Sequence, residues 1–295
     1  MYKAVIIYMG AAYENTLNAI KYQELLGKIK ILGVGVQSPF ASYMDGYPLF
    51  SLEAALKKEW DYILIAGQEA NFEQMKHLLM RIGINGEKVF SVNIFLIPEF
   101  DFEKYVELMN KKVSILSNHC WAGFTYHMLR AEFLSPFINM FIEGTDYIKL
   151  LENFEEYMSL DVSYYGSAYE PNLKREYPIG LLGDVKLHFN HYQTFEDAKE
   201  KWKIRKQRIN FNSLFVEMWT ESEEIAEKFS ELPFKQKIIF VPFETKFENA
   251  ISLKRLDAMW EGEFYSRVNG IANGQLGYYD LLKLLNGEKN FGRYQ

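Results

Sequence analysis

Hydrophobic positions in the first hundred residues fall into short runs that are separated by amphipathic stretches. Runs of this length, rich in β-branched residues, are typical of buried strands. The stretches between them repeat their apolar positions with a helical period and end at a glycine. Strands that alternate with helices predict a parallel sheet with right-handed crossovers. The predicted strands are residues 3–8, 31–36, 62–66 and 88–92, and the predicted helices are residues 13–26 and 71–82.

A second set of elements begins after residue 111. Residues 99–110 have a helical apolar stripe, and a new apolar run starts at residue 113. We therefore expect two α/β domains: a Rossmann-like parallel-sheet domain over residues 1–111, and a second α/β domain over residues 112–295. In the second domain the predicted strands are residues 113–117, 185–192, 213–219 and 237–241, and the predicted helices include residues 223–232 and 257–285.

The first predicted strand leads into Gly10, where a dinucleotide-binding domain has its phosphate-binding turn. The pattern G-x-G-x-x-G requires two further glycines, but this chain has Ala12 and Asn15 at those positions. Gln37 stands where an acidic residue would hold a ribose. The domain is therefore either a scaffold or a nucleotide-binding domain with a degenerate turn. Gly10 is the candidate cofactor-binding residue, and the cofactor itself stays unassigned.

Composition narrows the class of protein. The 295 residues carry a net charge of −6, so a general nucleic-acid binder, which needs a basic surface, is not expected. No apolar run approaches the ~20 residues that span a bilayer, and the first residues lack the layout of a signal peptide. The single cysteine cannot form an internal disulfide. We therefore expect a cytoplasmic protein without a membrane span, and its oligomeric state is left open.

The strongest candidate for chemistry is Cys120, which lies between the predicted strand 113–117 and a predicted helix. Open α/β sheets bind ligands where a strand ends and a helix begins. A helix N-terminus lowers the pKa of a thiol, and His119 would stabilise a thiolate if the turn folds it back. Cys120 is therefore either a nucleophile for acyl or glycosyl transfer or a small buried hydrophobic residue. The adjacent candidate substrate contacts are Asn118, His119 and Trp121.

Two histidines lie in the predicted strand 185–192. Alternation along a strand puts His191 on the apolar face and His188 on the opposite face, so a two-histidine metal site is not expected. His191 is either a core histidine or an inward-pointing base. Asp184, directly before this strand, is the candidate orienting carboxylate.

The helix that follows Thr194 carries an arginine within its apolar stripe. Arg205 falls on that face, and Arg208 flanks its edge. An arginine on a buried face needs a partner. That partner is either a carboxylate such as Asp184 or a bound anion, for which Arg205 and Arg208 would form a clamp.

The stretch 163–171 is rich in tyrosine and has the composition of a loop. Core packing does not explain tyrosines on a loop. Aromatic faces with a few polar groups suit a carbohydrate or a nucleotide base, and an interaction patch is the other interpretation.

Four segments of the second domain carry a family resemblance. They are Ile115–Gly123 (ILSNHCWAG), Ser135–Ile142 (SPFINMFI), Tyr177–Asp184 (YPIGLLGD), and residues 202–205 (WKIR) with 208–210 (RIN). These segments resemble a little-characterised bacterial family of unknown function whose members are often labelled exopolysaccharide biosynthesis proteins. The family pattern S-N-N-C-W-G-G differs here at His119 and Ala122, so a family-wide role for position 119 is not implied. The resemblance implies a context, cell-surface glycan assembly, rather than a mechanism.

A further segment of the first domain, Asp45–Glu53 (DGYPLFSLE), resembles a stretch of Rossmann-like domains that are attached to sugar-modifying enzymes. Together, the candidates and the resemblances indicate a transferase that acts on an activated sugar or a glycan precursor. Cys120 would be the nucleophile or a substrate contact, and His191 the base. The alternative is a non-enzymatic module that binds a glycan or a protein partner through residues 163–171.

Overall fold

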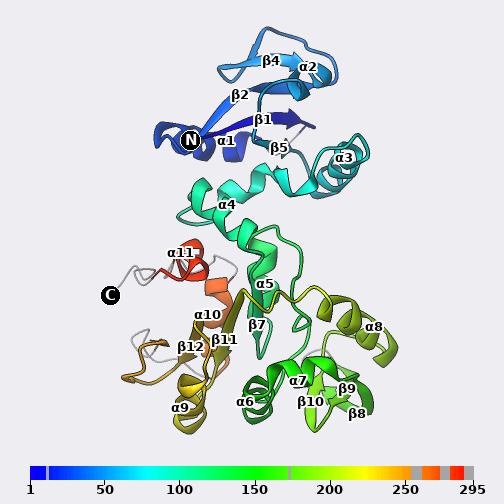
Figure 1. Cartoon of the computed structure of the whole chain (residues 1–295), viewed down its shortest axis with the longest axis vertical. Coiled ribbons are helices and arrows are strands. Elements are labelled where there is room, and N and C mark those ends of the chain that lie inside the picture. Colours follow the sequence, from blue (N-terminus) through cyan, green and yellow to red (C-terminus); the bar gives the residue numbers. More distant parts are fainter. Residues whose placement is uncertain (11–12, 172–173, 254–260, 273–279, 289–295) are drawn as a thin grey trace. The chain divides into compact units, whose positions relative to one another are not determined.

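The chain divides into two units, Met1–Glu107 and Leu108–Gln295, and both combine helices with a parallel sheet (Figure 1). The α/β class expected from the hydrophobic pattern is thereby confirmed. The computed structural model describes residues 1–10, 13–171, 174–253, 261–272 and 280–288.

The sheet of the first unit has the strand order β3-β4-β2-β1-β5-β6, and all neighbours are parallel except β3 and β4. The four strands predicted for this region correspond to β1, β2, β5 and β6. The pattern does not predict β4, which contains Pro48, a residue that disfavours a strand. The strands are β1 (Tyr2–Tyr8), β2 (Ile29–Val36), β3 (Tyr43–Met44), β4 (Tyr47–Ser51), β5 (Tyr62–Ala66) and β6 (Val89–Ser91).

Helices cover the first sheet because its central strands are apolar on both faces. All five residues of β5 are buried, as expected for a parallel strand with helices on either side. One core cluster joins Val5 and Ile63 of the sheet to Phe72 and Leu79 of α3. The helices are α1 (Glu14–Leu25), α2 (Leu52–Leu56) and α3 (Glu69–Arg81), with the 3₁₀ turns η1 (Gly86–Lys88) and η2 (Val92–Leu96). Helix α4 (Phe102–Lys111) contains the boundary between the two units, after Glu107.

A four-stranded parallel sheet organises the second unit in the order β13-β12-β11-β7. The predicted strands 113–117, 213–219 and 237–241 correspond to β7, β11 and β12. Because the strands are parallel, their carboxyl ends meet at one edge, where open α/β sheets bind ligands. The strands are β7 (Ser114–Ser117), β11 (Leu214–Trp219), β12 (Lys237–Val241) and β13 (Ala250–Ser252).

A three-stranded antiparallel sheet, in the order β10-β9-β8, lies between β7 and β11 in the sequence. Its strands are β8 (Ser163–Glu170), β9 (Arg175–Leu182) and β10 (Val185–His188). The tyrosine-rich stretch predicted to be a loop is therefore the edge strand β8, whose exposed side chains hide its strand character from the hydrophobic pattern. The predicted strand 185–192 ends earlier, at His188, because the chain turns at residues 190 and 191, where the Tyr192 amide donates to the Phe189 carbonyl at 2.9 Å.

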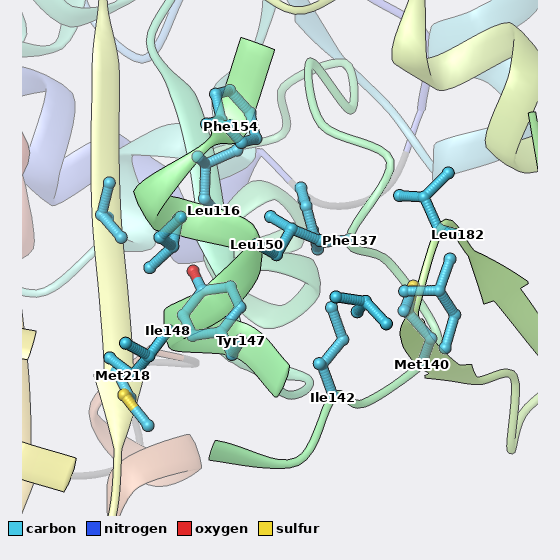
Figure 2. Close-up of a cluster of buried hydrophobic side chains, with 14 of the residues drawn as sticks. Leu116, Phe137, Met140, Ile142, Tyr147, Ile148, Leu150, Phe154, Leu182 and Met218 are labelled. Atoms are coloured by element: carbon cyan, nitrogen blue, oxygen red, sulfur yellow. The ribbon is translucent and has the colours of Figure 1, made fainter. Parts of the chain in front are cut away.

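Helix α6 (Gly144–Glu152) supplies the centre of the second unit's core. Figure 2 shows Tyr147, Ile148 and Leu150 of α6 lying between Met218 of β11 and Phe137. The Tyr147 hydroxyl also donates to the Glu217 carbonyl at 3.2 Å, so α6 is tied to β11 by a polar contact as well.

The remaining helices of the second unit are α5 (Trp121–Met128), α7 (Phe154–Ser159), α8 (Phe195–Lys206), α9 (Glu223–Glu231), α10 (Glu261–Ala272) and α11 (Leu281–Asn286). The helix predicted over 257–285 is represented by α10 and α11, and its positions 257–260 and 273–279 lie outside the described residues. Thr194 caps α8 by accepting from the Asp197 amide at 3.2 Å, as its position predicts. None of the helices in the described residues is both long and apolar enough to cross a membrane.

Candidate active site

A cavity of about 680 Å³ opens at the carboxyl ends of β7 and β11. The chain leaves β7 at Ser117 and enters α5 through Asn118, His119 and Cys120, the N-cap residue of that helix. Two hydrogen bonds hold this turn to the neighbouring strand: the Trp219 amide donates to Asn118 Oδ1 at 3.2 Å, and Asn118 Nδ2 donates to the Trp219 carbonyl at 3.4 Å. The cavity lining includes Asn118, His119, Cys120, His191, Trp219 and Tyr265.

Cys120 faces a histidine that lies 71 positions further along the chain. The Cys120 Sγ and His191 Nε2 atoms are 3.5 Å apart, within hydrogen-bond reach for sulfur. His191 stands on the turn after β10, and its side chain is exposed. The expectation of a core histidine on an apolar strand face is therefore wrong, because the strand ends three residues earlier. The alternative interpretation, a base directed at the site, agrees with this geometry.

Burial sets the charge state of this pair. Burial raises the pKa of the Cys120 thiol, and a hydrogen bond with the Tyr265 hydroxyl only partly opposes this effect. Partial removal of His191 from water, together with the positive charge of Arg175, lowers the pKa of the His191 imidazole. The expectation that the helix N-terminus lowers the thiol pKa is thus wrong, because desolvation outweighs it. At neutral pH the site holds a thiol and a neutral imidazole rather than an ion pair.

A buried polar network lies directly behind Cys120. Glu217, fully buried in the middle of β11, accepts from His119 Nε2 at 3.0 Å and from Ser117 Oγ at 2.6 Å. The His119 amide in turn donates to Ser117 Oγ at 3.2 Å. His119 therefore pairs with Glu217, so the condition under which it would stabilise a thiolate, a turn that folds it back onto Cys120, is not met. The network holds in place the turn that presents Cys120.

Aromatic side chains form one wall of the cavity. The rings of His119, Trp219 and Tyr265 contact one another, with centroid distances between 5.7 and 5.9 Å. Tyr265 comes from α10, which packs beside α5. Phe141 also lines the cavity. Flat aromatic faces beside polar groups suit the ring of a sugar.

Glu217 and the aromatic wall are not among the residues that the sequence pattern predicts. The signal for Glu217 is an acidic residue inside the apolar run LFVEMW, since a charge in a buried strand needs partners. No comparable signal identifies Phe141, Trp219 or Tyr265, because aromatic residues are frequent along this chain.

Asp184, predicted to orient the base, is an exposed residue outside the cavity lining. It accepts hydrogen bonds from the Tyr157 hydroxyl at 2.6 Å and from Lys149 Nζ at 3.1 Å. The predicted pairing of Asp184 with Arg205 is therefore wrong. The turn between β9 and β10 places Asp184 beside α6 and α7, away from Cys120.

Arg205 and Arg208, predicted to clamp an anion, also have protein partners. Arg205 donates to the Tyr192 hydroxyl at 2.7 Å and lies over the Phe133 ring. Arg208 forms a 2.9 Å ion pair with Glu132. Neither arginine lines the cavity. Pairing within the protein, the other interpretation that the sequence allowed, therefore describes Arg205 better than an anion clamp does.

Two further candidates lie outside the cavity. Trp121 is fully buried and stacks on Phe215, so the expectation of a substrate contact is wrong and the residue belongs to the core. Gly10 belongs to the first unit, where it follows β1 with a φ of +98°, a conformation that favours glycine. In the part of the chain that the structure describes, no group of three or more His, Cys, Asp or Glu residues is placed to hold a metal ion.

Comparisons with known proteins show which families the chain resembles. A family model described as a domain of unknown function, DUF1919, matches residues 91–286. A second model, described as C2185-like, N-terminal, matches residues 1–90. An uncharacterised protein of Haemophilus influenzae is 33% identical over 138 residues, which cover 45% of this chain and 64% of that protein. The chain thus spans just under two thirds of that relative's length.

Proposed function

The chain belongs to the DUF1919 family, and we propose that it is a cysteine-dependent transferase acting on a sugar or glycan precursor. In this proposal Cys120 carries the transferred group and His191 moves the protons. One observation supports it above all others: the 3.5 Å approach of Cys120 Sγ to His191 Nε2 in the wall of a 680 Å³ cavity. A nucleophile and a base within reach of each other are the first requirement of covalent catalysis.

The charge states of the pair fit a general-base mechanism for acyl transfer. As the thiol attacks the carbonyl of an activated acyl donor, His191 takes the thiol proton and delivers it to the leaving group, which leaves an acyl thioester on Cys120. An acceptor hydroxyl or amine then attacks the thioester. His191 removes the acceptor's proton and returns it to the departing sulfur. A neutral imidazole is the form needed at the start of both steps, and the lowered pKa of His191 keeps it in that form.

The substrate class rests on the cavity wall and on the family resemblance. Trp219, Tyr265 and Phe141 are aromatic residues of the wall that a sugar ring would contact, and Asn118 and Asn190 supply amide groups. The resemblance to proteins labelled for exopolysaccharide biosynthesis agrees with a glycan precursor made in the cytoplasm.

The first unit adds a second element of the proposal. Its parallel strands run in the order β4-β2-β1-β5-β6, which in chain order is 3-2-1-4-5, the order of a doubly wound Rossmann-like sheet. Gly10, at the end of the first strand, is the residue that we propose approaches a nucleotide.

An acylation assay tests the reaction directly. The probe is p-nitrophenyl acetate, an activated acyl donor whose release of p-nitrophenolate is followed by absorbance while intact mass reports an acetyl adduct. We expect a burst and an adduct in the wild type, and neither in Cys120→Ala. His191→Gln should slow acetylation by about 10²–10⁴-fold, the usual contribution of a general base.

His77→Gln, the same change at an exposed histidine of α3, is the matched control and should leave the rate unchanged. Acetylation of His191→Gln at the wild-type rate would overturn the proposal.

A second candidate function, a glycan-binding module without a reaction, is favoured by the edge strand β8. Tyr164 and Tyr169 of this strand are 59% and 61% exposed, which core packing does not explain. Tyr164 also lines a second cavity of about 430 Å³, together with Tyr177 and Phe195. Stabilisation by neutral oligosaccharides that is lost in Tyr164→Ala and kept in Cys120→Ala would support this function, and its absence would remove it.

A further inference from the structure

The charged residues that line the 680 Å³ cavity beside Cys120 are all acidic. Glu143, Glu170 and Glu221 contribute to its wall, whereas no lysine or arginine does so among the described residues. The thiol and the imidazole add no charge at neutral pH. A ligand that enters this cavity therefore meets carboxylates on its wall, whereas the nearby positive charge of Arg175 acts on His191 from outside the lining.

The acidic side chains come from three separate elements. Glu143 is the N-cap residue of α6 and is exposed, and Glu221 is an exposed residue between β11 and α9. Glu170 ends β8 directly opposite Arg175 in the antiparallel register, so this glutamate has a positive neighbour. The negative charge of the cavity wall therefore comes mainly from Glu143 and Glu221.

The rest of the wall favours a cationic or polar group as well. Trp219 and Tyr265 line the cavity, and aromatic rings attract cations through their quadrupoles. His119 is 3% exposed, lines the cavity, and has no hydrogen-bond partner for Nδ1 among the described residues. Nδ1 of His119 is therefore a buried polar atom that a polar group of a ligand would satisfy.

We propose that the acceptor recognised by this cavity is an amine, such as the amino group of an amino sugar, and that no phosphate enters it. The inference rests on the proposed function, in which that amine receives the acyl group from Cys120. The bound ammonium loses one proton to solvent, and the free amine attacks the thioester. The second proton passes through His191 to the departing sulfur, which yields an amide and the free thiol.

The single cysteine of the chain allows a test that does not require the natural substrate. Cys120 is labelled with two methanethiosulfonates, one carrying a trimethylammonium group and the other a sulfonate, and intact mass follows each rate. The ratio of the two rates, divided by the ratio for free N-acetylcysteine, measures the preference of the cavity for positive charge. We expect a preference of about tenfold or more at low ionic strength that shrinks at high salt.

The double variant Glu143→Gln/Glu221→Gln should bring the normalised ratio close to one. The matched control Glu200→Gln/Glu227→Gln removes the same charge from exposed positions of α8 and α9 and should keep the preference. A normalised ratio near one in the wild type, or a ratio that the first double variant leaves unchanged, would overturn the inference.

The same labelling separates this inference from the proposed function. His191→Gln should slow both reagents alike and leave their ratio intact. If it slows neither while the charge preference remains, the role of His191 as a base fails and the amine inference stands.

If Cys120 reacts with neither reagent, melting temperatures with glucosamine, N-acetylglucosamine and glucosamine 6-phosphate decide the matter. Glucosamine should stabilise the wild type most, and Glu143→Gln/Glu221→Gln should lose that advantage. Stronger stabilisation by the phosphate would overturn the inference.

Discussion

At the scale of single residues, desolvation governs the proposed chemistry. A thiol whose pKa is raised and an imidazole whose pKa is lowered are both uncharged at neutral pH, and they lie 3.5 Å apart. Cys120 is therefore a poor nucleophile until a base takes its proton. His191 is positioned to be that base, with Tyr265 as a second hydrogen-bond partner of the thiol.

The pH profile of acetylation by p-nitrophenyl acetate follows from these shifts. Protonated His191 cannot accept a proton, and because its pKa lies below the ordinary value of about 6.5, the rate should fall only at lower pH. Because the thiol pKa is raised, the rate should keep rising beyond the ordinary thiol range of about 8.5. His191→Gln should lose the acid limb. An acid limb centred above pH 6.5 in the wild type would contradict this account.

Glu217 offers a second prediction at this scale. Glu217→Ala removes the buried acceptor of His119 Nε2 and Ser117 Oγ, and leaving a buried hydrogen-bonding group unsatisfied typically costs about 1–3 kcal/mol. Urea denaturation should show a loss of unfolding free energy of this size. Glu217→Gln, which keeps an acceptor for His119, should recover part of it.

The exposed Glu227→Ala on α9 is the control and should stay within about 0.5 kcal/mol of the wild type. A loss for Glu217→Ala no larger than for this control would show that the network contributes little.

At the scale of elements, the antiparallel sheet β8–β10 brings the base to the thiol. Reciprocal backbone bonds hold His188, the last residue of β10, to Phe141, and the Phe189 amide donates to the Pro178 carbonyl at 3.1 Å. The chain then turns and places His191 against the N-terminus of α5. The position of His191 therefore depends on how closely this sheet packs against its neighbours.

Gly180 of β9 permits that close packing. A Cβ at this position would lie 2.5 Å from Val162 Cγ1 and 2.8 Å from Phe189 Cε2. Gly180→Ala should therefore lower the free energy of unfolding by about 1–3 kcal/mol, as overpacking usually does. It should also slow the acetylation of Cys120, because that reaction depends on the position of His191. Denaturation and the acetylation rate check both effects.

Gly166 of the neighbouring strand β8 is a matched control, because a Cβ there meets nothing within 4 Å. Gly166→Ala should leave the free energy of unfolding unchanged or raise it by about 0.4–1 kcal/mol. Equal effects of the two substitutions would show that packing at Gly180 does not limit stability.

At the scale of the whole molecule, each unit has a buried apolar cluster of its own. Val5, Ile63 and Phe72 belong to the core of the first unit, whereas α6 and β11 centre that of the second. Every residue that lines the 680 Å³ cavity beside Cys120 belongs to the second unit. Stability of the first unit and reactivity of Cys120 should therefore respond to different substitutions.

Tyr47→Phe tests this separation. It removes the hydrogen bond from the buried Tyr47 hydroxyl to the Glu24 carboxylate in the first unit. We expect a loss of about 1.5–3 kcal/mol of unfolding free energy, typical of a bond to a charged group, and an unchanged acetylation rate at Cys120. Tyr265→Phe, the same change beside the thiol, should alter the rate. A parallel drop in rate for Tyr47→Phe would link the two units functionally.

The sequence by itself determined the α/β class, most strands of both parallel sheets, and the place of Cys120 at a strand end. These features are local: hydrophobic periodicity reports which positions of one element are buried, and parallel strands end at a common edge. The edge strand β8 and the short β4 escaped this reasoning, because exposed tyrosines and Pro48 mask the period.

Only the tertiary structure decided which groups meet. Periodicity cannot show that His191 reaches Cys120 across 71 positions, that Glu217 binds His119, or that Asp184 and Arg205 have other partners. The raised pKa of the thiol likewise depends on how much water the packed cavity excludes, a property of the assembled fold. Contacts between distant elements arise from packing and turn geometry. The local pattern of polar and apolar positions along the chain does not specify either of them.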